Sequence, residues 1–203
     1  MDQEDVIDQV SCFVDEECIE QLGYSGWAKS GNGVWVEFLL CSSDDRIFHR
    51  CKDCEFFYMY CCVFVELKVK FPFTDFQCGV LTQLRCAPSQ LHPNSWAFAR
   101  GFEMWMEYLE VRLSLEVFFA LFQAKGVEKG QWISLSSISG RLVFAPYRSL
   151  FKGFKQMFVK VRALVGISRF MLMKICLKNS CYVGIPNLGG RWPREPPRST
   201  LLA

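Results

Sequence analysis

The chain has 203 residues, of which 51% are hydrophobic and 15% aromatic, a size and composition that suit one domain with a sizeable core and exclude wholesale disorder. Its longest uncharged apolar run, residues 56–65, is too short to span a membrane as a helix. The first residues are acidic, where a secretory signal would be basic and then apolar, so we expect an intracellular protein of the nucleus or the cytoplasm without membrane contact.

Charge is separated along the chain, although the net charge is only +2. Residues 1–20 hold eight acidic residues and no Lys or Arg, whereas residues 141–203 hold 12 basic residues and one acidic residue. Residues 129–194 contain no Asp or Glu. Two interpretations stay open: the two ends screen each other, or the basic half binds a polyanion.

The cysteines predict free thiols rather than a disulfide scaffold. Their number, 11, is odd, we expect no export signal, and the chain is long enough to form a core without disulfides. Several lie within apolar runs, where cysteine behaves as a small buried hydrophobic residue: Cys61, Cys62, Cys78 and Cys176. We therefore predict reduced thiols in a reducing compartment.

The N-terminal part of the chain predicts an arm, a strand and a buried segment. Residues 1–33 are rich in acids and broken by glycines, which predicts a flexible acidic arm. A short strand is predicted over residues 34–40 and a turn over residues 42–45. Residues 55–67 are nearly all apolar and fit either a helix buried on all sides or a buried strand. We favour the helix because this run is long for a strand.

Local start signals predict three helices in the middle of the chain. Thr74 and Gln77 fit a capping box, in which the two side chains bond backbone N–H groups of the first turn. Pro93 suits the first turn of a helix, where its missing N–H would have no partner. Ser114 has the chemistry of a cap, and apolar residues follow it at helical spacing.

The C-terminal part predicts a hairpin, a helix and a disordered end. Residues 132–135 and 142–144 read as the two strands of a hairpin. Phenylalanines and lysines alternate over residues 151–160, a pattern typical of a basic amphipathic helix. Glycines and prolines crowd residues 183–203 and predict disorder there.

Taken together, these elements predict an α+β fold: a mainly helical single domain with a small β-hairpin, a flexible acidic N-terminal arm and a disordered C-terminal tail. The arm covers residues 1–33, and the globular domain covers residues 34–165. Residues 166–203 form the basic tail, which is rich in proline and glycine.

One group of residues has some of the chemistry of a zinc site: His49, Cys51, Cys54 and Cys61. Zinc prefers four thiolate or imidazole ligands, and a Cys-x-x-Cys turn supplies two of them. No second Cys-x-x-Cys follows, however, and Cys61 lies in an apolar run. We therefore favour structural thiols and predict neither a metal nor a cofactor.

Catalytic groups are sparse in the sequence. His92 precedes Pro93 at a predicted helix start, where a capping or packing role is expected. Neither a Gly-x-Ser-x-Gly elbow nor a phosphate-binding glycine loop is found. The acids of the clearest helix, Glu103, Glu107 and Glu110, read as its solvent face rather than as metal-binding carboxylates. We expect no enzyme and no small-molecule substrate.

The basic half offers candidate contacts to nucleic acid, because Lys and Arg neutralise phosphates and exposed aromatic rings stack on bases. The candidate residues are Arg148, Lys152, Lys155, Lys160 and Arg162. The alternative is that the phenylalanines are core residues and the lysines are only solvated.

Two motifs carry a resemblance to a known family: Phe-Pro-Phe-Thr-Asp-Phe at residues 71–76 and Ala-Pro-Ser-Gln-Leu-His-Pro-Asn-Ser-Trp at residues 87–96. Together with Gly-Phe-Glu at residues 101–103 and the segments 114–119 and 130–135, they resemble the plant "putative gypsy-type transposon" family. The resemblance is closest over residues 55–165. The chain looks like a truncated member, because it lacks the long charged, coiled-coil-like region with which members of the family continue.

The resemblance implies a plant transposable-element origin and a structural role akin to that of a retrotransposon coat-type protein, with no catalytic residues to carry over. We expect a non-enzymatic structural or interaction protein that self-associates. The alternatives are a nucleic-acid-binding protein that uses residues 129–194 and a truncated product without function. We expect Pro93, Asn94 and Trp96 to determine the fold rather than to bind a ligand.

Overall fold

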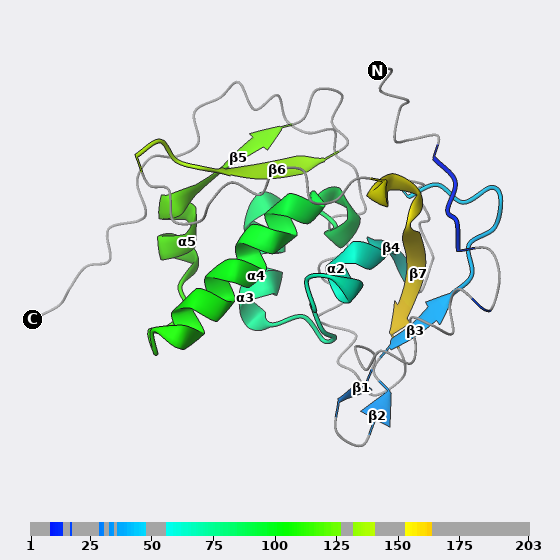
Figure 1. The fold of residues 1–203 in the computed structure, drawn as a ribbon, viewed down its shortest axis with the longest axis horizontal. Coiled ribbons are helices and arrows are strands. Elements are labelled where there is room, and N and C mark those ends of the chain that lie inside the picture. Colours follow the sequence, from blue (N-terminus) through cyan, green and yellow to red (C-terminus); the bar gives the residue numbers. More distant parts are fainter. Residues whose placement is uncertain are drawn as a thin grey trace, which may run out of the picture.

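The computed structural model describes residues 9–13, 17, 29–30, 33–34, 36–47, 56–126, 132–140 and 153–163. The helices and strands of these residues (Figure 1) are β1 (Lys29–Ser30), β2 (Gly33–Val34), β3 (Val36–Leu39), β4 (Phe56–Tyr60), α2 (Cys61–Val65), α3 (Asp75–Leu84), the short 3₁₀ helix η2 (Pro88–Gln90), α4 (Pro93–Tyr108), α5 (Leu115–Leu121), β5 (Phe122–Gly126), β6 (Ile133–Ser137), the 3₁₀ helix η3 (Phe154–Gln156) and β7 (Phe158–Ala163). None of the described helices is long and apolar enough to cross a membrane.

The central strand of a three-stranded antiparallel sheet comes from the C-terminal end of the described residues. β7 lies between β3 and β4, with Val161 opposite Phe38 on one side and Val159 opposite Met59 on the other. Val159 and Val161 are fully buried, while Lys160 and Arg162 between and after them are only partly covered. This alternation follows from the two-residue period of a strand.

Two segments that the sequence analysis assigned to helix contain strands. Within residues 55–67, where the sequence fits a helix or a strand, the structure has both: the strand β4 is followed directly by the helix α2, which begins at Cys61. The predicted basic helix over residues 151–160 is wrong: η3 and then β7 occupy its described part. The expectation of a mainly helical domain is therefore wrong as well, although the α+β class is confirmed.

The three helix starts in the middle of the chain are confirmed. Thr74 and Gln77 form the capping box of α3, in which Gln77 N donates to Thr74 Oγ1 at 3.1 Å and Thr74 N donates to Gln77 Oε1 at 3.2 Å. Ser114 Oγ accepts from Val117 N at the start of α5. Pro93 is the first residue of α4, as predicted. These starts depend on residues within one turn, which the sequence displays directly.

The described hairpin pairs β6 with a strand that the sequence analysis did not predict. β6 matches the first predicted strand, but its antiparallel partner is β5, with Ala124 opposite Leu135. Residues 142–144, the partner expected from the sequence, lie outside the described residues. The short helix α5 ends at Leu121, and Phe122 continues directly as β5.

Aromatic rings fill the space between the helices. Phe76 of α3 stacks on Phe102 of α4 with ring centroids 5.6 Å apart, and Phe118 of α5 packs against both at 5.3 Å. Gly79 on α3 permits this approach, because a Cβ there would lie 2.5 Å from a methyl carbon of Leu115. The layer of α3, α4 and α5 with the β5–β6 hairpin is called the helical half below, and β3, β4 and β7 form the sheet half (Figure 1).

Part of the predicted acidic arm packs against the sheet half. Cys12 N donates to Gln156 O at 2.9 Å, and Cys41 N donates to Phe13 O at 3.0 Å. Ser11 and Phe13 are buried. The rest of residues 1–33, apart from a few isolated positions and the short strands β1 and β2, lies outside the described residues, and so do the predicted disorder at residues 183–203 and the whole of residues 166–203.

Candidate interaction surface

The motif at residues 87–96 forms an internal joint between α4 and β6. Leu91 pairs with Ile133 in a single parallel bridge, and His92 N donates to Ile133 O at 3.0 Å. Ser95 Oγ, fully buried, accepts from Leu135 N at 2.7 Å. The buried indole of Trp96 donates through Nε1 to Pro88 O at 3.1 Å. The motif residues Leu91, Ser95 and Trp96 therefore link α4, β6 and η2 inside the fold.

His92 is the N-terminal cap of α4. Its Nδ1 accepts from Asn94 N at 3.1 Å, and its ring packs edge-on against Trp132 and Phe154 at 5.5 and 5.3 Å. Burial lowers the pKa of His92 to about 4, because the positive charge would be desolvated. The imidazole is consequently neutral near pH 7, which leaves Nδ1 free to accept the capping hydrogen bond.

Glu103 corrects the prediction of a solvent-facing row of acids on α4. Its side chain is only 7% exposed, whereas Glu107 and Glu110 are exposed as predicted. Thr74 Oγ1 donates to Glu103 Oε1, and Gln77 Nε2 donates to Glu103 Oε2 at 2.8 Å. Arg100 lies 3.5 Å away. The buried carboxylate thus joins α4 to the first turn of α3.

The zinc candidates are not brought together in the described part of the chain. His49, Cys51 and Cys54 lie outside it. Cys61 is fully buried at the start of α2, and burial raises the pKa of its thiol, which disfavours the thiolate that zinc requires. Among the described residues no three His, Cys, Asp or Glu side chains are placed to hold a metal.

Two of the candidate nucleic-acid contacts are paired with acids, one in β3 and one in the turn that follows it. Lys160 Nζ forms an ion pair with Asp45, and Arg162 donates twice to Glu37 Oε2, at 3.0 Å from Nε and 2.6 Å from Nη2. Lys155 Nζ lies 6.0 Å from the ring centre of Trp132. Arg148 and Lys152 lie outside the described residues.

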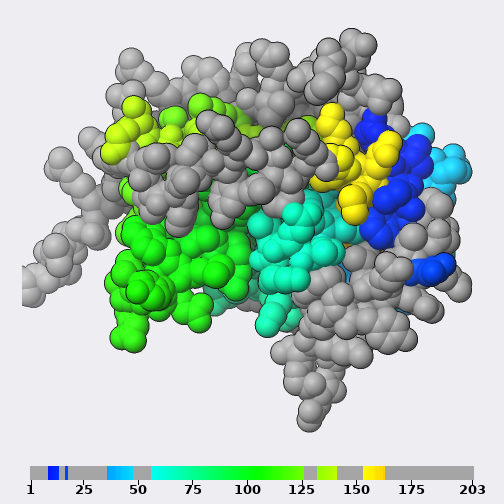
Figure 2. Space-filling view, viewed as in Figure 1, coloured from blue at the N-terminus to red at the C-terminus, as the bar shows by residue number. Residues whose placement is uncertain are grey.

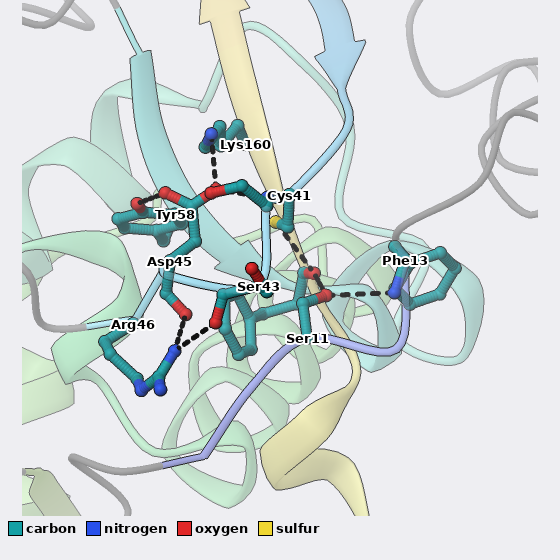
Figure 3. A network of polar contacts seen from close by, with 10 residues as sticks. Ser11, Phe13, Cys41, Ser43, Asp45, Arg46, Tyr58 and Lys160 are labelled. Atoms are coloured by element: carbon teal, nitrogen blue, oxygen red, sulfur yellow. Dashed lines mark hydrogen bonds and ion pairs between the residues drawn. The ribbon is translucent and has the colours of Figure 1, made fainter.

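Figure 3 shows the hydrogen-bond donors that surround Asp45. Tyr58 Oη donates to Asp45 Oδ1 at 2.7 Å, and Ser42 N donates to Oδ2 at 2.6 Å. Burial alone would raise the pKa of Asp45, but the hydrogen bonds from Lys160, Tyr58 and Ser42 outweigh it and lower the pKa to about 2. Phosphate binding at Lys160 would have to compete with this carboxylate.

Exposed apolar side chains gather at the end of α4, in the connection to α5 and in the first turn of α5. We call them the α4–α5 apolar surface: Met104 (55% exposed), Tyr108 (84%), Leu109 (45%), Val111 (55%) and Val117 (47%). They are five of the nine exposed large hydrophobic residues in the part of the chain that the structure describes. Figure 2 shows this end of α4 at the lower left of the molecule.

The backbone at the end of α4 presents the connecting residues outward. Glu110 N donates to Glu107 O and Val111 N donates to Met106 O, at 3.1 and 3.0 Å, which is the pattern of a Schellman motif. Glu110 takes the left-handed position of this motif with φ 55°, where glycine is usual. The turn is therefore defined by hydrogen bonds, and it projects Leu109 and Val111 into solvent.

The sequence analysis missed this surface. The buried stripe of α4 contains Phe98, Phe102 and Met106, and the same periodicity places Met104 and Tyr108 one helical turn apart on a different face. Apolar residues outside the buried stripe were thus the available signal. The signal is weak, because single exposed apolar residues are normal on protein surfaces and only their grouping is informative.

The described residues define an α+β domain whose internal motif joins α4 to β6 and whose exposed apolar residues include five at the end of α4, in the connection and at the start of α5. Residues 59–126 match a family model described as "Putative gypsy type transposon", which confirms the resemblance over that range and relates the chain to transposable elements. The matched range contains the internal motif, Glu103 and the whole α4–α5 apolar surface. No curated protein and no solved structure matches the chain.

Proposed function

We propose that the chain is a non-enzymatic structural protein, derived from a gypsy-type transposable element of a plant genome, that self-associates through the α4–α5 apolar surface. The observation that carries the proposal is the grouping of five exposed apolar side chains within residues 104–117. Exposed apolar groups of this kind mark interaction sites, because contact with a partner removes their surface from water.

A second copy of the chain is the partner that we propose. The exposed charges beside the apolar residues have both signs: Glu107, Glu110 and Glu116 are acidic, and Arg112 is basic. In a two-fold interface each patch meets its own copy, so Arg112 of one copy can approach an acid of the other. The surface also lies within residues 59–126, which match the model of the transposon family. This supports an interaction role that members of the family have in common.

A non-enzymatic role is supported by what the reactive side chains do in the fold. His92 caps α4 and is neutral at physiological pH. Burial raises the thiol pKa values of Cys61, Cys62 and Cys86, so these cysteines are poor nucleophiles. The candidate nucleic-acid contacts Lys160 and Arg162 are occupied by Asp45 and Glu37, and we therefore place self-association ahead of nucleic-acid binding.

Light scattering coupled to gel filtration tests the proposal. We expect the mean mass of the wild-type protein to rise above that of one chain as concentration rises. Tyr108→Glu should lower it, because it brings a charge into the centre of the contact. The matched control is Val65→Glu on α2, another exposed apolar residue outside the surface, which should leave the mass unchanged. A wild-type protein that stays monomeric at every concentration would contradict the proposal.

A further inference from the structure

Residues 9–13, which we call the strap, complete the sheet half where its own strands stop pairing. β3 and β7 pair as far as Leu39 opposite Lys160. Beyond this point the strap lies between the chain at Cys41, after β3, and the chain at Gln156 and Phe158, at the start of β7 (Figure 3). A segment from the N-terminal part of the chain is therefore hydrogen-bonded at the end of the sheet half.

The strap is held by directional bonds and by one buried ring. Phe13 O accepts from Cys41 N, and Cys12 N donates to Gln156 O. Ser11 Oγ donates to Phe158 O and accepts from Phe13 N, so the hydroxyl both fixes the strap to β7 and shapes its turn. Phe13 is part of the hydrophobic core. At the rim Gln156 Nε2 donates to Gln9 Oε1 at 3.0 Å.

Apart from the bond between Ser11 and Phe13, each of these contacts joins residues that are distant in sequence. Residues 14–35 separate the strap from β3, and this length of chain is able to span on the order of 70 Å when extended. A strap from a second copy would make the same bonds in the same place, which is the condition for exchange of an element between protomers. Only the path of the connecting residues would differ.

Charge favours an encounter between the strap of one copy and the sheet of another. The strap lies within residues 1–20, which hold eight acidic residues and no basic ones. The strand that receives it belongs to the basic part of the chain, since residues 141–203 hold 12 basic residues and one acidic residue. Opposite charges at the two ends of one sequence attract between copies as well as within one copy.

We propose that the strap exchanges between copies of this chain, so that residues 9–13 of one copy dock between Cys41 and Phe158 of another. The inference rests on the proposed self-association. A connection of about this length gives a strap an effective concentration on the order of millimolar for its own sheet, so exchange requires copies that are held close together. The α4–α5 apolar surface supplies that proximity.

Isotope mixing tests the exchange in the full chain. The double variant Gln9→Glu with Gln156→Lys places a carboxylate and an amine where the two amides now touch, and a carbodiimide reagent joins such a pair without a spacer. Equal amounts of ¹⁵N-labelled and unlabelled double variant are incubated together at high concentration, linked and digested. Mass spectrometry then shows whether the two halves of the linked peptide carry the same isotope. The single variant Gln9→Glu is the control for unspecific coupling.

We expect about half of the linked peptides to carry one labelled and one unlabelled half, as random exchange between copies requires. Linked peptides with matched isotopes only, or no link at this pair at all, would overturn the exchange. Matched isotopes in a protein whose mass still rises with concentration would overturn the exchange and leave the proposed self-association intact. A monomeric protein with matched isotopes would overturn both.

Discussion

The helical half and the sheet half are stabilised in different ways. The helical half is packed from aromatic rings, of which Phe76, Phe102 and Phe118 are in mutual contact, with a single buried carboxylate at Glu103. The sheet half also has aromatic contacts, such as Tyr58 with Phe158, and adds ion pairs, such as Lys160 with Asp45, and the docked strap. In the helical half, α4 has exposed apolar side chains beside its buried aromatic rings. In the sheet half, Lys160 and Arg162 are paired with acids of the same chain. This difference is why we propose the helical half as the side that contacts a second copy.

The largest change in stability is expected for a substitution of Glu103. It tests how much the buried hydrogen bonds of this carboxylate stabilise the helical half. Glu103→Ala should lower the free energy of unfolding by about 2–4 kcal/mol, because Thr74 and Gln77 lose their partner in a buried place. Urea denaturation measures the loss. Glu107→Ala, an exposed acid on the same helix, is the control and should change the stability by less than about 0.5 kcal/mol.

Acid should destabilise both halves, but in two separate pH ranges. The pKa of His92 is about 4 in the folded protein against an ordinary 6.5, so the unfolded state alone takes up a proton between these values. The free energy of unfolding should therefore fall by on the order of 2–3 kcal/mol as pH drops from about 6.5 to 4, with the full stability present above that range. Asp45, with a pKa of about 2 against 3.8, should add a second fall below pH 4.

Two variants separate these ranges in urea denaturation followed against pH. His92→Asn keeps an acceptor for the cap of α4 but cannot titrate, so the fall between pH 6.5 and 4 should disappear while the lower one remains. Asp45→Asn should remove only the lower one. A wild-type stability that stayed constant from pH 7 to 4 would contradict the buried, neutral state of His92.

The smallest change in stability is expected at Glu110, at the end of α4. Glu110 has φ 55°, a conformation that costs a side chain more than it costs glycine. Glu110→Gly should raise the free energy of unfolding by about 0.5–1 kcal/mol, and Glu110→Ala should not. Thermal denaturation is sensitive enough to compare the two variants, and an equal effect of both would contradict the left-handed turn.

Local signals predicted the helical half well, and distant partners account for most of what was missed. The starts at Thr74, Pro93 and Ser114 need only residues within one turn, and all three are confirmed. β7 pairs with strands about one hundred residues away, so its phenylalanines and lysines resembled a helix until those partners were known. Glu103 was misplaced for the same reason, because Thr74 and Gln77 belong to another helix.

The candidate site was less predictable than the fold. The sequence analysis expected self-association from a family resemblance but did not name the residues that would mediate it. The sequence analysis did not single out Met104 and Tyr108, and only the structure shows that they are exposed beside the buried stripe of α4. Lys160 and Arg162 looked available for phosphate, because their acidic partners Asp45 and Glu37 come from distant segments.

Hydroxyl-radical footprinting of two methionines tests the central claim most directly. Met104 is 55% exposed on the α4–α5 apolar surface, and Met157 is 43% exposed in the sheet half, so each molecule contains its own control. We predict that oxidation of Met104 falls as the protein concentration rises, while oxidation of Met157 stays constant. If the oxidation rate of Met104 stayed as constant with protein concentration as that of Met157, the result would contradict self-association through this surface.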